Sequence, residues 1–70
     1  MDAKAIGARL ARLRGSRTQE EVAKAVFVTP AAISMYEKGE RIPRDEIKVA
    51  LARYYKKTVE SIFFADSVNR

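Results

Sequence analysis

The side chains of this chain that could do chemistry are mainly cations. Thirteen of the fourteen lysines and arginines lie between Lys4 and Lys57, a span with six acidic residues, and the formal net charge is +5. Such an excess of positive charge on 70 residues indicates a polyanionic partner, usually nucleic acid. Many small basic proteins have no such partner, however, so charge alone leaves the question open.

The residues on which most enzymes and metal sites depend are absent. The sequence has no cysteine and no histidine, which excludes disulfides, thiolate zinc sites and the commonest general base at neutral pH. No phosphate-binding glycine loop and no paired-carboxylate spacing marks a catalytic centre. We therefore expect a protein that is not an enzyme, with no catalytic residue, no metal and no cofactor.

The length and the apolar pattern predict a single cytoplasmic domain over residues 1–70. The apolar runs are a few residues long, whereas a membrane-spanning helix needs about 20, and the N-terminus lacks a signal-peptide core. We therefore expect no membrane association. A chain this short buries only about 60% of its unfolded surface, so it depends on efficient helix packing or on a partner.

Five short helices must position the cations. No segment alternates between apolar and polar residues as a strand would. In the first helix Ile6, Leu10 and Leu13 form one apolar stripe, and Gly15 is a typical terminator. In the fourth helix the expected stripe is Ile47, Ala50, Leu51 and Tyr54. The fold class is all-α, a compact bundle of helices expected at residues 3–14, 19–26, 30–38, 44–55 and 59–64.

The second and third helices are separated by only Phe27-Val28-Thr29. Thr18 and Glu21 have the spacing of a capping box, and Thr29 can cap the third helix, which has Pro30 at its first position. A linker this short sets two helices at a steep angle, which is the helix-turn-helix arrangement. We place this motif at about residues 18–39. Its expected buried face is Val22, Ala23, Val26, Ile33 and Tyr36.

Five segments, IGARLARLR, TQEEVAKAV, AAISMYEKG, GERIP and TVESIFF, together resemble the lambda repressor and Cro-type (Xre family) helix-turn-helix domains. The resemblance covers residues 6–64, and each segment alone is unspecific. It implies a double-stranded DNA partner, with the third helix in the major groove and two copies on half-sites about 34–36 Å apart. It thus implies a sequence-specific DNA-binding transcriptional regulator, a repressor that binds a short pseudo-palindromic operator as a homodimer.

The resemblance also assigns residues to the site. The outward residues of the third helix would contact bases: Ala31, Ser34, Met35 and Lys38. Phosphate contacts would come from Gln19, Thr29, Arg41 and Arg44, with Arg17 and Lys24 as further candidates. Arg14 and Glu37 would form a structural ion pair between the first and third helices. The alternatives are a core-filling role for Met35, a capping role alone for Thr29 and a simple solvated surface for the others.

Two features depart from the family pattern. The loop Gly15–Arg17 is about two residues shorter than the common family loop. Phe27 stands where the family usually has a glycine, because that residue adopts a positive φ. We expect Phe27 to accept this strain and to bury its ring; the alternative is a turn of a different shape.

The C-terminal helix, about residues 58–64, carries more apolar area than one core face needs. We expect the dimer interface there, at Val59, Phe63 and Phe64, because at least one of the two rings would be exposed in a monomer. The alternative is that both rings fold back onto the core. A different functional reading follows from the same helix, namely an antitoxin-like protein-interaction module that holds a partner protein. We expect no small-molecule effector, because 70 residues leave no room for a separate domain that senses one.

Overall fold

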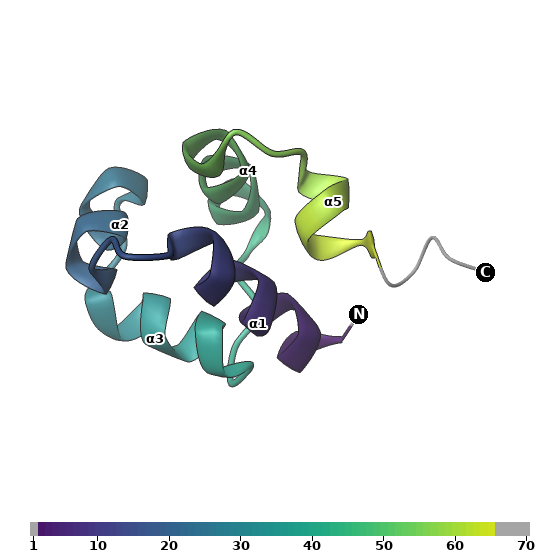
Figure 1. The fold of residues 1–70 in the computed structure, drawn as a ribbon, viewed down its shortest axis with the longest axis horizontal. Helices are drawn as coiled ribbons and strands as arrows, with labels where there is room; N and C mark the ends of the chain where they lie inside the picture. The colour runs from purple at the N-terminus through teal and green to yellow at the C-terminus, as the bar shows by residue number, and fades with distance from the viewer. Residues whose placement is uncertain (1, 66–70) are drawn as a thin grey trace.

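The computed structural model describes residues 2–65. Within this part the chain forms helices and no strand, so the all-α fold class is confirmed. Figure 1 shows α1 crossing the centre of the molecule, with α2 and α3 at one end and α5 at the other. No helix among these residues is long and apolar enough to span a membrane. The helices are α1 (Ala3–Arg14), α2 (Gln19–Val26), α3 (Pro30–Lys38), α4 (Asp45–Tyr55) and α5 (Val59–Phe63).

Threonine side chains set the starts of three helices. The Oγ1 atoms of Thr18, Thr29 and Thr58 each accept a hydrogen bond, at 3.0–3.1 Å, from the backbone N–H three residues further on. These bonds satisfy N–H groups that have no partner within the helix, which is why the cap positions could be predicted. The fourth and fifth helices are each one residue shorter than expected, since Arg44 is the N-cap of α4 and Phe64 the C-cap of α5.

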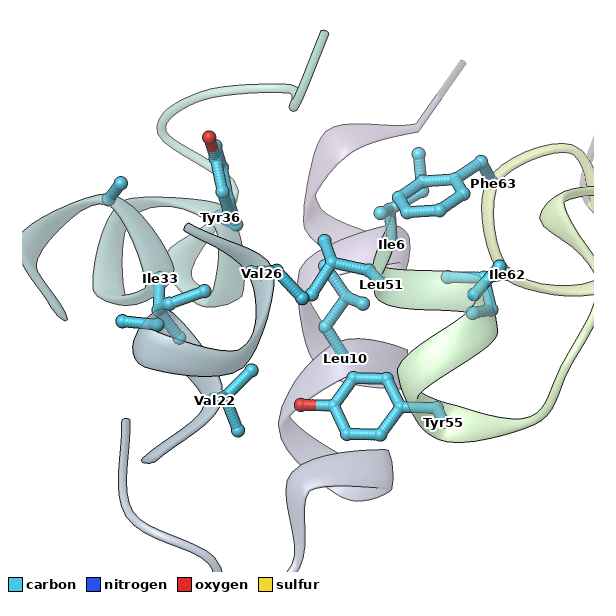
Figure 2. Packing of buried hydrophobic residues seen from close by; sticks show 13 residues of the cluster. Ile6, Leu10, Val22, Val26, Ile33, Tyr36, Leu51, Tyr55, Ile62 and Phe63 are labelled. Carbon is cyan, nitrogen blue, oxygen red and sulfur yellow. The ribbon is translucent and has the colours of Figure 1, made fainter. Parts of the chain in front are cut away.

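The core gathers side chains from all five helices, as Figure 2 shows. The expected inward residues of α2 and α3 are buried. The stripe expected on α4 is partly wrong, because Ile47, Ala50 and Tyr54 lie only half-buried at the margin of the core. The buried face of α4 is Lys48, Leu51, Ala52 and Tyr55.

Lys48 is the unexpected member of this buried face. Its residue is only 9% exposed, and its ammonium lies 3.4 Å from a carboxylate oxygen of Asp45 and 5.6 Å from the centroid of the Phe64 ring. A lysine can bury its aliphatic stem while its charge reaches a partner at the margin. A pattern that counts lysine as polar therefore points to the wrong side of the helix.

The aromatic patch expected on α5 is not exposed. Phe63 is only 2% exposed, and in Figure 2 its ring lies beside Ile6. Phe64 is half-buried and packs against the core. Burying a phenyl side chain contributes about 1.5–3 kcal/mol, which a core this small cannot readily obtain elsewhere. The burial of Phe63 removes the argument that placed this ring in a dimer interface, and that assignment stays a prediction.

Two glycines allow α1 to rest directly on α3. A Cβ on Gly7 would approach the carbonyl oxygen of Tyr36 to 2.6 Å and would also collide with that of Glu37. Gly39, which ends α3 with a φ of +75°, would bring a Cβ to 2.9 Å from the Cα of Lys4. The orientation of α3 is thus fixed by backbone-to-backbone contact with α1.

Candidate nucleic-acid interface

The outward face of α3 carries the four residues predicted to contact bases. Ala31 and Lys38 are exposed, and Ser34 and Met35 are half-buried. The opposite face of the same helix is buried in the core through Ala32, Ile33 and Tyr36. Met35 is not a member of the buried cluster, which argues against a core-filling role. This face of α3 therefore carries two small side chains, a methionine and, near its end, a lysine.

Thr29 joins α3 to the turn before it. Its Oγ1 accepts a hydrogen bond of 3.1 Å from the N–H of Ala32, so the predicted capping role is confirmed. A threonine hydroxyl has one proton to donate as well as lone pairs that accept. The cap therefore leaves the hydroxyl able to donate a hydrogen bond outward from the start of the helix.

Glu37 is the centre of a polar network that connects three helices. Its side chain is 7% exposed. It accepts hydrogen bonds from Nε of Arg14 at 2.7 Å, from Nη2 of Arg14 at 3.0 Å and from Nε2 of Gln19 at 3.0 Å. The bond to Glu37 raises the pKa of Arg14 above its usual value. The predicted ion pair between Arg14 and Glu37 is thus present.

Gln19 has a protein partner that the sequence did not indicate. One N–H of its amide is used by Glu37, and the second N–H is available for an outside acceptor. Glu37 therefore fixes the orientation of this amide in the first turn of α2. Glu20 and Glu21 are exposed in the same turn, so an anion bound there would be held by N–H groups and not by net positive charge.

Arg41 and Arg44 lie on one surface, just beyond the end of α3. Both are exposed, whereas Pro43 between them is buried. Together with Tyr36 and Ile42 they line a hollow of about 260 Å³. The buried proline anchors the segment to the core between the two exposed arginines. The structure thus brings together the two arginines that the resemblance assigns to phosphates.

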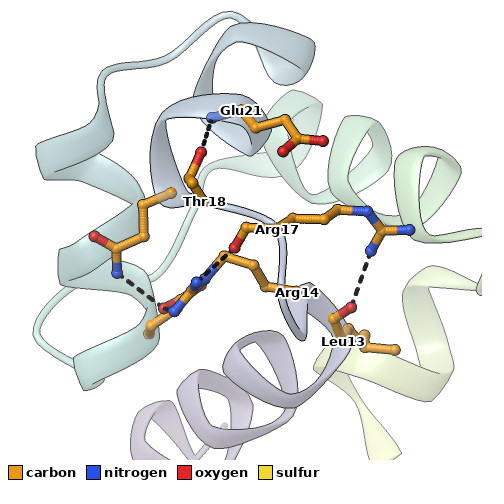
Figure 3. Close-up of polar contacts among 7 residues, drawn as sticks. Leu13, Arg14, Arg17, Thr18 and Glu21 are labelled. Carbon is orange, nitrogen blue, oxygen red and sulfur yellow. Dashed lines mark hydrogen bonds and ion pairs between the residues drawn. The ribbon is translucent and has the colours of Figure 1, made fainter.

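Arg17 lies elsewhere and packs against α4. Its guanidinium carbon is 5.3 Å from the centroid of the Tyr54 ring and 5.7 Å from that of Tyr55. Its Nη1 donates to the carbonyl of Leu13 at 3.1 Å (Figure 3), and its own carbonyl accepts from Arg14 at 2.7 Å. These contacts tie the short loop between α1 and α2 to the tyrosines of α4. They give Arg17 a structural role.

Phe27 adopts the left-handed conformation, but its ring is not buried. Its φ is 61° and its ψ 43°, so the expected positive φ is confirmed. The side chain is 92% exposed, and the expectation of a buried ring is wrong. Val28 takes the inward place instead, half-buried against the core and with its N–H bonded to the carbonyl of Ala23 at 3.0 Å. A left-handed residue at the end of α2 directs its own side chain to solvent.

Two short helices joined by a left-handed turn, the second with an outward face bounded by cations, define a DNA-binding domain of the transcription-regulator class. Residues 9–62 match the helix-turn-helix family, and the chain belongs to this family, of the lambda repressor and Xre type.

The same fold is found in a solved regulator structure. The chain is similar to the clp gene regulator ClgR from C. glutamicum, with a TM-score of 0.77 and 25% sequence identity, over 99% of this chain and 95% of that one. None of the curated proteins compared with the chain is significantly similar to it.

Proposed function

We propose that this regulator is a sequence-specific repressor that binds a short pseudo-palindromic operator as a homodimer, with α3 in the major groove. The observation that carries the proposal is the outward face of α3, with the Thr29 hydroxyl at its start and Arg41 and Arg44 beyond its end. The similar protein from C. glutamicum is itself described as a gene regulator, which agrees with this role.

Base reading would come from α3. Ala31 and Ser34 are small enough to let the helix backbone lie close to the base edges. Ala31 can touch a thymine methyl, Ser34 can donate or accept, and Lys38 can reach a guanine. None of these forms the bidentate pair with guanine or adenine that discriminates most strongly. A large share of the specificity should therefore come from the shape and deformability of the DNA.

Phosphate contacts would hold the domain in register on the duplex. Arg41 and Arg44 would clamp one phosphate group from their shared hollow. Gln19 and Thr29 would donate from the first turns of α2 and α3, where the helix dipole and the free backbone N–H groups favour an anion. The amide of Gln19 is already oriented for this by Glu37.

The dimer would form through α5. Val59 and Phe64 are half-buried in the single chain, so each keeps apolar surface that a second copy could cover. The burial of Phe63 reduces the apolar surface that α5 offers to a second copy and to a foreign partner protein alike, so the choice of a dimer rests on the half-site geometry of the family. Two recognition helices would then meet half-sites about one helical turn apart.

Binding to DNA across a range of salt concentrations tests this function. The protein would be titrated by fluorescence anisotropy onto a labelled duplex from the region upstream of its own gene, and onto a random duplex, between about 50 and 200 mM salt. We expect the upstream duplex to bind at least about a thousandfold more tightly. Equally weak binding of both duplexes would contradict regulation of its own gene.

Paired variants test the phosphate clamp. In Arg41→Ala/Arg44→Ala, the slope of log affinity against log salt should become shallower by about two for the dimer. Each of the two protomers loses the one phosphate contact that its arginines share, and each lost contact removes about 0.9 from the slope. Arg12→Ala/Arg53→Ala removes the same charge from exposed positions on α1 and α4 and should leave the slope unchanged. If both double variants reduce the slope equally, the two arginines act only through net charge.

A further inference from the structure

Phe27 combines a strained backbone with an exposed apolar ring. Of the two large apolar side chains exposed among residues 2–65, Phe27 is 92% exposed and Val49 40%. A bulky residue at a φ of 61° is strained, whereas a glycine would adopt that conformation freely. Burial could offset such strain, but this ring is in water. The fold therefore gains nothing from this side chain, and strain that the fold does not need is typical of functional positions.

The position of Phe27 in the chain places its backbone close to the proposed DNA surface. It precedes Thr29, the N-cap of α3, by two residues, and two residues of extended chain span at most about 7 Å. A phenyl side chain covers much of such a distance. Lys24, exposed in the last turn of α2, supplies a positive charge close by in the chain. When the N-terminus of α3 lies at the bases, the ring is within reach of the neighbouring nucleotides.

We propose that Phe27 is a DNA-contacting residue whose ring packs against an apolar part of the operator, either a thymine methyl or a deoxyribose, beside the bases that α3 faces. This inference rests on the proposed function. Phenylalanine is among the side chains that make apolar contacts with thymine methyls. Such a contact would cover the ring and explain why a glycine does not occupy the turn.

The substitution Phe27→Gly tests the proposed DNA contact separately from the stability of the fold. Phe27→Gly relieves the strain of the turn, so its melting temperature should equal or exceed that of the wild type. Its affinity for a preferred duplex, selected from random-sequence DNA, should nevertheless fall about tenfold, because the apolar contact is lost. Phe27→Tyr keeps an aromatic ring and should bind within about threefold of the wild type.

A control variant and three further outcomes decide whether Phe27 contacts DNA. Val49→Ala trims the other exposed apolar residue and should change neither affinity nor specificity. If Phe27→Gly is folded and binds as tightly as the wild type, the contact does not exist and the ring faces some other partner, such as a protein. If the wild type itself shows no preference over random DNA, the proposed function fails together with this inference. Should Phe27→Gly not fold, Phe27→Asn, which also tolerates this backbone conformation, replaces it.

Uracil substitution distinguishes the two apolar groups. Replacing the thymines of the selected duplex by uracil, one at a time, removes single methyl groups. If the ring packs on a methyl, one replacement weakens the wild type and leaves Phe27→Gly unaffected. If it packs on a deoxyribose, no replacement distinguishes the two proteins, although their difference in affinity persists.

Discussion

The carboxylate of Glu37 holds three helices together through hydrogen bonds. Glu37 belongs to α3, and its hydrogen-bond donors are Arg14 on α1 and Gln19 on α2. A charge that is 7% exposed needs partners, since removing one of them leaves it desolvated and uncompensated. The group that orients the helix-turn-helix pair is thus also the group that aims the amide of Gln19.

Ionisation of Tyr55 should lower the stability of the fold at alkaline pH. Burial raises its pKa from 10.0 to about 12. Because the folded pKa lies above the unfolded one, the stabilisation is fully present below pH 10 and is lost as the pH rises toward 12. Tyr55→Phe cannot ionise. Urea unfolding of both proteins at pH 10 and at pH 12 should show the wild type losing about 1 kcal/mol more of its free energy of unfolding than the variant, since solvent screening of the hydroxyl reduces the full linkage of about 2 kcal/mol. Parallel losses would contradict the assignment.

Residue roles differ in how far they could be predicted from the sequence. The threonine caps follow from local spacing, and the ion pair between Arg14 and Glu37 follows from the family resemblance. The bond of Gln19 to Glu37, the position of Arg17 over two tyrosines and the exposed ring of Phe27 depend on how the helices are placed relative to one another. Spacing along a chain carries little information about such contacts.

At the scale of elements, the helix bounds were largely predictable, but the faces of α4 and α5 were not. Caps, glycines and prolines act locally, so the ends of helices can be predicted from the sequence. The buried face of α4 includes Lys48, whose stem behaves as apolar. The burial of Phe63 depends on whether the core has room for a ring. Both are properties of packing.

Gly7 should tolerate no side chain, because α1 touches the backbone of α3 at this position. Gly7→Ala gains about 1 kcal/mol of helix propensity but puts a methyl group 2.6 Å from the carbonyl oxygen of Tyr36, where backbone cannot yield. Overpacking of this kind costs about 3 kcal/mol, so we expect a net loss of about 2 kcal/mol in the free energy of unfolding. Ala8→Ser, exposed on the same helix, is the control and should change stability little. A more stable Gly7→Ala would show that α1 does not need this close approach.

At the scale of the whole molecule, the association of two copies through α5 can be tested directly. Val59→Glu places a charge in the proposed interface, at a helix N-terminus that favours an acid. Sedimentation velocity should then show a monomer at concentrations where the wild type dimerises, and binding to a full palindrome should fall to the level of a single half-site. Val49→Glu, on exposed α4 surface, should remain dimeric. A dimeric Val59→Glu would move the interface away from α5.

Lys56 is a second residue in the left-handed conformation, and its strain can be put to practical use. It ends α4 with a φ of 58° and a ψ of 45°, and it is exposed. Unlike Phe27, it lies between α4 and α5 in the chain and not next to α3, so its strain can be removed without changing any residue of the proposed DNA surface. Lys56→Gly thus offers protein engineers a more heat-resistant scaffold, on which damaging changes to the recognition helix can be explored without loss of the fold.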